Sequence, residues 1–304
     1  MAKLILLSDL HLRDTIPQGR IDNFQDTMWS KLEFVFRIAE DEKVDAILQA
    51  GDFFDKAKPS YGLVTRFIAT HQFFNSTPIY CVIGQHDMYM RSSNIADTAF
   101  GLLATMEILF IAQKFPVGIK DCMIYGNSYG DTYDFEVETK YNAINILITH
   151  DMIGNKPLYP GHEYTDAGKF LADHPEFDII LCGDYHYPFH IRRDGRHIVN
   201  TGCMLRMTRD DRDMNRKPFF YIVDTTKNEW KQYEIPHEPV NMVFADKKDV
   251  PELAITNEGD LLRFIQQLKQ KGKSGIHYLD VLDEYCREHE ISNEVQDLIK
   301  EVLI

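Results

Sequence analysis

The sequence has no long hydrophobic run. None of its apolar stretches approaches the roughly 20 residues that a membrane-spanning helix needs. The first run, at residues 4–7, reaches Asp9 almost at once and is too short for the core of a secretory signal peptide. We therefore expect a soluble, cytoplasmic protein with no membrane partner.

Cysteine is also scarce. The 304 residues include five cysteines, an odd number, and no two of them stand in a CxxC spacing. This argues against a disulfide framework and against a zinc site built from thiolates. The cysteines are Cys81, Cys122, Cys182, Cys203 and Cys286. We expect them to be buried free thiols in a reducing compartment.

Positive charge is in short supply. The chain has 33 Lys and Arg against 47 Asp and Glu, a net charge of -14, which argues against a protein that coats DNA. It does not exclude a nucleic-acid enzyme, because bound divalent cations reverse the local field. One stretch differs: residues 192–217 hold eight Arg or Lys against four Asp. Two interpretations have equal weight, contact with a phosphate backbone and a solvated, salt-bridged loop.

What the chain does have is an alternation of apolar runs and amphipathic segments. Strands are predicted at residues 4–7, 44–49 and 79–83, and helices at 24–39 and 61–74. This β-α-β-α-β order favours a parallel sheet in an α/β fold.

The second part of the chain is richer in strand signals. A helix is predicted at residues 94–109, and strands at 122–125, 143–149, 177–182, 196–200, 219–224 and 229–235. After Pro236 and Pro239 the apolar spacing becomes helical. We therefore expect a domain of residues 1–240 and a short, mainly helical C-terminal extension of residues 241–304.

Several of the predicted strands end in residues that can bind metal. The central one is followed by Gly51 and Asp52, and the Asp52 carboxylate has two oxygens with which to bridge two ions. The other ends read Asp9-Leu10-His11, Gly84-Gln85-His86-Asp87, Thr149-His150 and Gly183-Asp184-Tyr185-His186. In open α/β sheets, ligands bind outside the carboxyl ends of the strands. The pattern therefore predicts one polynuclear metal site.

Such a site suits the hydrolysis of phosphate esters. The reaction must neutralise charge on the phosphoryl oxygens, make water nucleophilic and stabilise the leaving oxygen. Two divalent ions roughly 4 Å apart can meet all three needs.

The ordered set of strand ends resembles the calcineurin-like metallophosphoesterase superfamily. That family has D-x-H, G-D-x-x-D, G-N-H-D/E, a lone H and G-H-x-H, in this order. The likeness covers residues 1–225, and five motifs in sequence are far more specific than one. It implies a four-layer α-β-β-α sandwich with two central mixed sheets.

The resemblance also implies roles for the motif residues. Asp9, His11, Asp52 and His186 would hold the first metal ion, and Asp52, Gln85, His150 and Asp184 the second. His86 would protonate the leaving oxygen or steady the phosphate, because an imidazole can carry a proton near neutral pH. Asp87 would orient the His86 ring.

Two positions depart from the family pattern. Gln85 stands where the family has Asn, and Asp184 where it has His. Gln keeps the amide oxygen on a side chain one methylene longer, and Asp replaces a nitrogen ligand with an oxygen. The resulting oxygen-rich shell favours Mn²⁺, with Mg²⁺ as the alternative. An added carboxylate also lowers the Lewis acidity of the ion. We interpret the second site as weaker, differently selective or empty.

Within the superfamily the sequence looks most like the SbcD-type DNA-repair nucleases, the meiotic-recombination nuclease family. The features are Ser8-Asp9-Leu10-His11-Leu12, Gly51-Asp52-Phe53-Phe54-Asp55, and the segment from Asn200-Thr201-Gly202 to Arg206 followed by Lys217-Pro218. This likeness implies a DNA exonuclease or endonuclease, with Arg206 as a substrate-binding residue. It also implies an ATPase partner of the SbcC type, for which residues 241–304 would be a docking segment. The alternative role of that segment is homodimer contact.

Two other functions stay open at this point. One is a phosphatase or a phosphodiesterase for small molecules such as cyclic nucleotides. The other is a metal-bound scaffold subunit whose altered second site has lost catalysis and which positions a partner.

Overall fold

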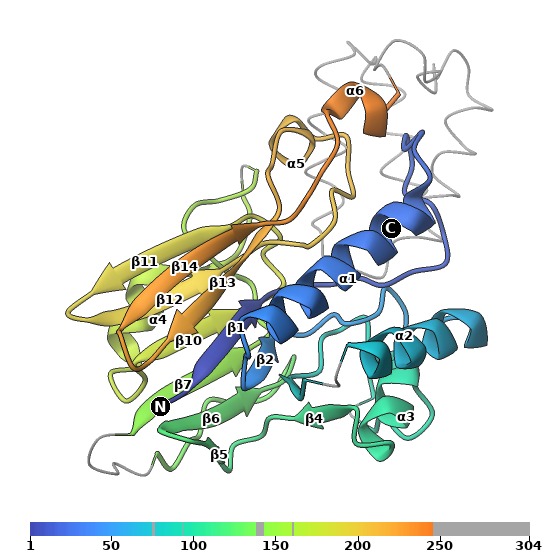
Figure 1. The fold of residues 1–304 in the computed structure, drawn as a ribbon. Helices are drawn as coiled ribbons and strands as arrows, with labels where there is room; N and C mark the ends of the chain where they lie inside the picture. Colours follow the sequence, from blue (N-terminus) through green and yellow to red (C-terminus); the bar gives the residue numbers. More distant parts are fainter. Residues whose placement is uncertain (75–76, 93, 138–142, 160, 246–304) are drawn as a thin grey trace, which may run out of the picture. The chain divides into compact units, whose positions relative to one another are not determined.

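The computed structural model describes residues 1–74, 77–92, 94–137, 143–159 and 161–245 (Figure 1). A first six-stranded sheet has the order β14-β13-β1-β2-β3-β4. Its strands are β1 Lys3–Leu7, β2 Ala46–Gln49, β3 Ile79–Cys81, β4 Leu109–Ile111, β13 Phe219–Asp224 and β14 Glu229–Glu234. β1 to β4 are parallel, and β13 and β14 complete the sheet in antiparallel register.

A second six-stranded sheet has the order β11-β12-β10-β7-β6-β5. Its strands are β5 Val117–Ile119, β6 Cys122–Asn127, β7 Ile144–Thr149, β10 Ile179–Cys182, β11 Phe189–Arg193 and β12 Arg196–Asn200. The four inner strands run parallel and the two edge strands antiparallel. β8 Ile153–Gly154 and β9 Thr165–Asp166 form a small separate pair.

The helices lie outside the two sheets. α1 Phe24–Asp41, α2 Tyr61–Phe73 and α3 Ala99–Thr105 belong to the first sheet, and α4 Ala167–Asp173 to the second (Figure 1). The short elements are η1 Tyr89–Arg91, α5 Asp211–Met214 and α6 Val240–Val243. Side chains of Asn23 and Ser60 accept backbone N–H groups at the starts of α1 and α2, which sets where these helices begin.

Alternation along β1 shows how the layers form. Ile5 and Leu7 pack into an apolar cluster with α1, α2 and α3. Leu4 and Leu6 face the other way, into a cluster shared by the two sheets, because successive strand side chains point to opposite faces. A third cluster lies between the second sheet and α4. The expected four-layer α-β-β-α sandwich is thus confirmed.

The predicted helix at residues 94–109 is wrong in extent. The helix α3 begins after Thr98, whose side chain accepts the Gly101 N–H, and ends at Thr105. Glu107 then has a left-handed backbone with a φ of 56°, and the chain turns into edge strand β4. The apolar run around Leu109 fits a strand beside β3 as well as a helix face, and pairing with β3 decides between them.

Three further expectations concern the cysteines, membrane-spanning helices and the C-terminal extension, and the described residues cover them only in part. Cys81, Cys122, Cys182 and Cys203 are buried free thiols, as expected, and Cys286 lies outside the described residues. No helix in the described ranges is long and apolar enough to cross a membrane. From residue 246 on, the expected helical extension and its docking or dimer role fall outside the described part of the chain.

The layer between the sheets makes a stability prediction. Leu48 is fully buried there, so Leu48→Ala removes packing that the sheets cannot easily refill. We expect the free energy of unfolding, measured in urea, to fall by about 2–5 kcal/mol. Leu102→Ala, at a leucine of α3 that is 45% exposed, is the control and should change it by less than about 0.5 kcal/mol. Equal losses in the two variants would contradict this account of the core.

Candidate metal centre

The loops that follow β1, β2, β3, β7 and β10 meet at one place. Asp52, after β2 in the first sheet, lies with its Oδ2 atom 3.4 Å from Nε2 of His150, which follows β7 in the second. The amide N–H of Asp184, after β10, donates to Oδ1 of Asp9, after β1, at 3.0 Å. The strand ends of both sheets therefore face each other across the site.

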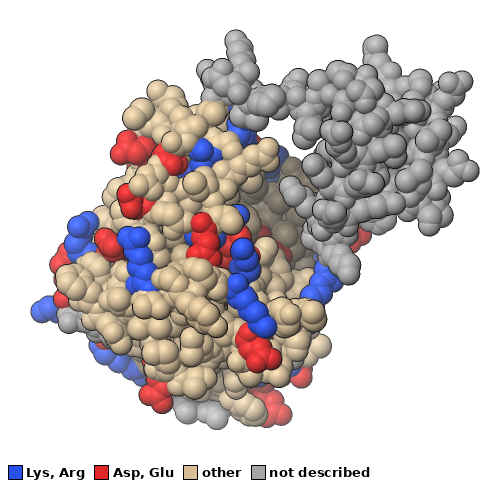
Figure 2. All heavy atoms as spheres, turned by 90° about the vertical axis from the view of Figure 1, so that its right-hand side faces the viewer, with Lys and Arg blue, Asp and Glu red and all other residues tan. Residues whose placement is uncertain are grey.

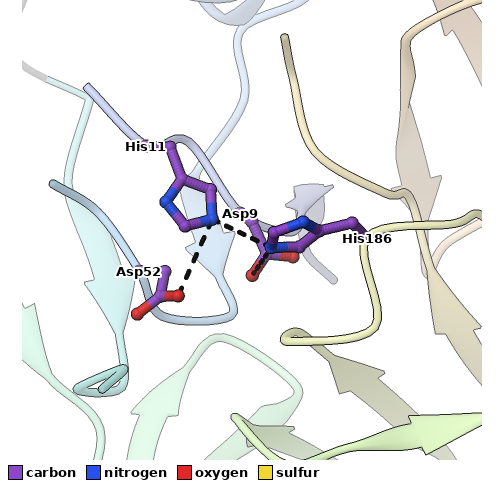
Figure 3. Close-up of side chains that lie close together, drawn as sticks. All are labelled: Asp9, His11, Asp52 and His186. Carbon is purple, nitrogen blue, oxygen red and sulfur yellow. Dashed lines mark hydrogen bonds and ion pairs between the residues drawn. The ribbon is translucent and has the colours of Figure 1, made fainter. Parts of the chain in front are cut away.

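The four residues expected at the first metal ion are gathered in one cluster (Figure 3). One ligand atom from each of Asp9, His11, Asp52 and His186 lies within 4.8 Å of the others. The Nε2 atoms of His11 and His186 are 3.0 Å apart, and His11 Nε2 is 3.7 Å from Asp52 Oδ2. Two imidazole nitrogens and two carboxylates that point at one position suit a divalent cation. Metal binding by this set stays a prediction.

The residues expected at the second ion lie beside this cluster. Nδ1 of His150 is 2.5 Å from the Ala50 carbonyl and donates to it, so in the neutral ring that can bind a metal Nε2 carries the lone pair. That lone pair faces Asp52 Oδ2, and two acceptors in contact call for a cation between or beside them.

The two departures from the family pattern contact each other. Gln85 Nε2 donates to Asp184 Oδ1 at 2.6 Å. The additional methylene of Gln lengthens the amide side chain, and the carboxylate of Asp184 supplies an acceptor where the family pattern has His. Gln85 Oε1 is buried and has no hydrogen-bond partner, which leaves it available to a metal ion. The two changes are therefore complementary.

Buried polar atoms without partners test whether the site fits a metal. Eleven such side-chain atoms occur among the described residues, and five belong to expected ligands. These five are Asp9 Oδ2, His11 Nδ1, Asp52 Oδ2, Gln85 Oε1 and His150 Nε2. Each unsatisfied buried group costs about 1–3 kcal/mol, more when charged, so their concentration at one place fits a bound cation.

Burial and close charges shift the pKa values of the ligands. Burial raises the pKa of Asp9 and lowers that of His11 well below its usual value. Burial also works to raise the pKa of Asp52, but His150, His11 and His86 outweigh it and hold the pKa below its usual value. For His150, burial is outweighed by Asp52 and Asp9, which raise its pKa. These groups interact strongly because little water separates them.

The backbone around the ligands is held in uncommon conformations. His11, Asp52 and Asp184 have positive φ values of 48°, 48° and 67°. Non-glycine residues adopt this left-handed region at a cost of about 1–3 kcal/mol each, and such strain is found at functional sites. The strained turns aim each side chain back over the end of its strand.

Gly84 lets two of the loops approach closely. A Cβ atom on Gly84 would lie 2.2 Å from Asp52 Oδ1 and 2.3 Å from the Asp52 backbone nitrogen. The amide N–H of His86 donates to the same Oδ1 at 2.9 Å. The loop after β3 thus holds one oxygen of Asp52 and leaves the other to the metal position.

His86 lies at the open side of the site. Its side chain is 44% exposed, with Nε2 3.9 Å from Asp52 Oδ2. Nδ1 donates to the Asp55 carbonyl at 3.0 Å, which fixes the ring and directs Nε2 towards the metal position. The placement suits a residue that contacts substrate.

Asp87 occupies a different place from the one expected. Its buried carboxylate accepts the backbone N–H groups of Phe53, Phe54 and Gly84, at 3.0–3.1 Å. The partner of the His86 ring is the Asp55 carbonyl, so the expected Asp87 contact with that ring is corrected. Burial, aided by the Asp52 carboxylate, raises the pKa of Asp87 to about 7. Asp87 joins the loops after β2 and β3.

Arg206 is also corrected. It is only 4% exposed, and its guanidinium donates to the carbonyls of Met214 and Glu238 at 2.9 Å and 2.6 Å. The two hydrogen bonds join the segment before β13, at Met214, to the segment after β14, at Glu238. A buried guanidinium engaged in this way is a structural element, so Arg206 is not placed to bind substrate.

The basic stretch does not form one surface beside the site. Arg193 pairs with Arg196 at the β11–β12 turn, whereas Phe189 pairs with Asn200 at the other end. β12 runs parallel to β10, so its carboxyl end lies on the side of the site and Arg196 on the far side. Among the described residues on the face drawn in Figure 2, Lys and Arg are interspersed with Asp and Glu. Within the stretch, Arg216 pairs with Asp213 and Lys217 with Glu234, so the salt-bridged alternative applies to these two residues.

Two residues that sequence reasoning did not single out brace the site. The Ser8 N–H donates to Thr201 Oγ1 at 2.8 Å, and the Thr201 N–H donates to Ser8 Oγ at 3.0 Å. Ser8 Oγ also donates to the Cys182 carbonyl at 2.9 Å. These bonds join the ends of β1, β10 and β12 across the two sheets. The Asn200-Thr201-Gly202 turn was the available signal for Thr201.

Gln49 is a third bracing residue. Its fully buried amide donates to the Ser8 and Gly51 carbonyls at 3.1 Å and 2.5 Å and accepts the Gly51 N–H. The sequence signal was a polar amide within an apolar strand. Gln49 fixes the turn that presents Asp52.

The fold and the clustered ligands define a metallophosphoesterase. The sequence profile of the calcineurin-like phosphoesterase family matches residues 2–188, more than half of the chain, and the chain belongs to this family. The family comprises hydrolases of phosphate esters that use divalent metal ions, and the described cluster is the candidate place for those ions.

Two curated relatives share the name DNA double-strand break repair protein Mre11. The one from Halobacterium salinarum is 27% identical over 224 residues, which cover 70% of this chain and 54% of the relative. The one from Methanosarcina mazei is 27% identical over 167 residues, covering 51% of this chain and 26% of the relative. The chain thus spans about half the length of the first and about a quarter of the second.

Solved structures that align with this chain include the protein TT1561 of Thermus thermophilus. It is 14% identical, with a TM-score of 0.46, over 77% of this chain and 99% of that one. An archaeal phosphodiesterase is 17% identical, with a TM-score of 0.44, over 76% of this chain and 99% of that one.

The close approach at Gly84 makes a first prediction for the site. Gly84→Ala would displace the Asp52 carboxylate, because the added methyl group occupies its position. We expect Mn²⁺ affinity, measured by isothermal titration calorimetry, to fall about 10–100-fold. Gly62→Ala in α2 is the control, since its Cβ meets only Ser60 Oγ at 3.7 Å. If Gly84→Ala bound Mn²⁺ with unchanged affinity, Asp52 would not be a metal ligand.

Metal binding should also stabilise the fold. An ion at 100 times its dissociation constant adds about 2.7 kcal/mol to the free energy of unfolding, which raises the melting temperature of a domain of this size by several degrees. We expect MnCl₂ to raise the melting temperature of chelator-treated native protein. The increment should vanish in Asp52→Asn and persist in Asp173→Asn, at an exposed residue paired with Lys169. The same increment in Asp52→Asn would contradict the proposed ligand set.

Proposed function

We propose that this chain is a divalent-metal-dependent phosphodiesterase that cleaves DNA, as an exonuclease or endonuclease subunit in DNA repair. The observation that carries the proposal is the convergence of ligand side chains from five strand ends, four of which bring buried unpaired atoms, beside the exposed ring of His86. Its placement in the phosphoesterase family supports hydrolysis of phosphate esters. The two relatives named for double-strand break repair support DNA as the substrate.

Two divalent ions would be held by the two neighbouring ligand sets, with Mn²⁺ favoured over Mg²⁺. Asp9, His11, Asp52 and His186 would hold one, and Gln85, His150 and Asp184 would join Asp52 around the other. When bound, such ions supply neutralising charge to the phosphoryl oxygens and lower the pKa of the attacking water. The amide oxygen of Gln85 and the carboxylates favour hard ions.

His86 would act on the leaving oxygen. The Asp55 carbonyl keeps a proton on Nδ1, so the second ring nitrogen is the one that can gain and lose a proton at the site. A proton on Nε2 would pass to the departing alcohol oxygen. The orientation of the His86 ring is set by a backbone carbonyl, which does not titrate.

Partners follow from the same likeness. We propose an SbcC-type ATPase as the partner and residues 241–304 as the segment that docks it or forms a homodimer. The resemblance to the SbcD-type nucleases implies such an ATPase, and the chain matches only part of the length of the relatives.

A second candidate function is hydrolysis of small phosphodiesters or phosphomonoesters. The buried position of Arg206, and the location of Arg193 and Arg196 at the far end of β12, remove expected contacts to a long backbone. A scaffold without turnover is a third, since the Gln85–Asp184 bond alters the second metal position. Metal binding without activity, unchanged by Gln85→Asn with Asp184→His, would support the scaffold.

The deciding experiment is cleavage of linear single-stranded and double-stranded DNA with Mn²⁺, Mg²⁺ or chelator. We expect manganese-dependent cleavage that falls about 10²–10⁴-fold in His86→Ala, the usual contribution of a general acid. His237→Ala, at a half-buried histidine beyond β14, should cleave like the native chain.

The outcome separates the candidates. If the protein binds ions but cleaves no DNA with any of them, the nuclease proposal fails for this chain. Hydrolysis of a small aryl phosphodiester under the same conditions would then support the second candidate.

A further inference from the structure

Arg209 has one edge of its guanidinium group unused. Its Nε and Nη2 atoms are buried, yet neither has a hydrogen-bond partner in the described part of the chain. Buried donors of a charged group are expensive to leave unpaired. This feature lies apart from the metal ligands and plays no part in the chemistry described above.

Two other arginines show what this edge binds. Arg20 donates through Nε and Nη2 to the two carboxylate oxygens of Asp22, at 2.8 Å and 2.6 Å. Arg216 donates through the same pair of atoms to Oδ1 of Asp213, at 3.1 Å and 2.9 Å. The Nε and Nη2 donors lie side by side and suit an oxyanion bound at both atoms. Arg209 presents this pair without an anion.

Two carboxylates close to Arg209 in the sequence, those of Asp210 and Asp213, already have other partners. Asp210 accepts from the Tyr187 hydroxyl at 3.3 Å and from the Arg212 N–H at 2.8 Å. Asp213 accepts from the Met207 and Thr208 N–H groups as well as from Arg216. The anion that Arg209 lacks would therefore come from a ligand.

The position of Arg209 relates it to the metal centre. A Cβ atom on Gly19 would lie 2.3 Å from Arg209 Cδ, so the side chain packs on the loop that leaves His11. Its neighbour Asp210 is bonded to Tyr187, the residue after His186. Arg209 therefore packs on the loop that follows His11, and its neighbour Asp210 is bonded to the loop that carries His186.

We propose that the Nε and Nη2 edge of Arg209 binds a phosphodiester oxyanion of a polynucleotide, at a phosphate that flanks the one being hydrolysed. The inference rests on the proposed function and makes the substrate more specific. In the described part of the chain, the contacts of the expected metal ligands do not include Arg209, and we assign its edge to a phosphate other than the scissile one. A small diester has no second phosphate to fill this edge, whereas a polynucleotide does.

The test is equilibrium binding of a fluorescent oligonucleotide at several salt concentrations. It is made in the His86→Ala background with Mn²⁺ present, so that cleavage is slow. Arg209→Gln should weaken binding about 10-fold and reduce the salt slope by about one phosphate contact. Arg209→Lys should keep the slope while losing affinity, because Lys retains the charge without the paired donors. Otherwise native Arg209→Gln should lose more activity on an oligonucleotide than on a small aryl phosphodiester, because only the oligonucleotide has a flanking phosphate.

A structural role for Arg209 predicts a different set of results. Arg216→Gln removes the two hydrogen bonds to Asp213 and should lower the melting temperature. Arg209→Gln removes donors that have no partner in the described residues and should leave the melting temperature unchanged. Arg193→Gln, at an exposed position at the far end of β11, is the control for charge alone and should bind like the parent. A melting temperature that falls in Arg209→Gln as in Arg216→Gln would overturn the proposal.

The outcomes also separate this inference from the proposed function. If the parent binds the oligonucleotide and Arg209→Gln binds with the same affinity and salt slope, the Arg209 proposal fails and the nuclease proposal stands. If the parent binds no oligonucleotide and cleaves none, both fail.

Discussion

The Asp52 carboxylate is the point on which the site depends. One oxygen accepts the His86 N–H, and the other faces His150 and His11 without a hydrogen bond of its own. This division requires Gly84 to lack a side chain and Asp52 to adopt a left-handed backbone. The polar atoms that loops from both sheets bury at this point are suited to shared cations. The geometry of the site therefore depends on how the two sheets pack, since each sheet supplies part of the ligand set.

The two departures from the family pattern, Gln85 and Asp184, compensate for each other. Gln85 alone would reach too far and Asp184 alone would add an unpaired carboxylate. Together they form a hydrogen bond of 2.6 Å and still offer an amide oxygen to a metal ion. The pair keeps an amide oxygen at the second metal position and makes that position richer in oxygen. It favours tuning of metal preference over loss of the site, which the cleavage experiment decides.

The arginines of the second half show that composition is a weak guide to binding. Arg206 and Arg216 are buried and bonded to carbonyls or to Asp213, and Arg193 lies at the far end of its sheet. Only the contacts of each guanidinium distinguish a structural arginine from an available one. Arg209 stands out because its paired donors face no acceptor in the described residues.

The sequence by itself determined the alternating strand and helix order and the ligand types at the strand ends, and its resemblance to a known family implied the layered fold. It did so because side-chain periodicity and short turns are local properties. Tertiary structure alone decided that Asp87 binds loop N–H groups, that Arg206 is buried and that residues 109–111 pair as a strand. These outcomes depend on which distant groups lie within about 3 Å of a side chain, and hydrogen bonds have no longer reach.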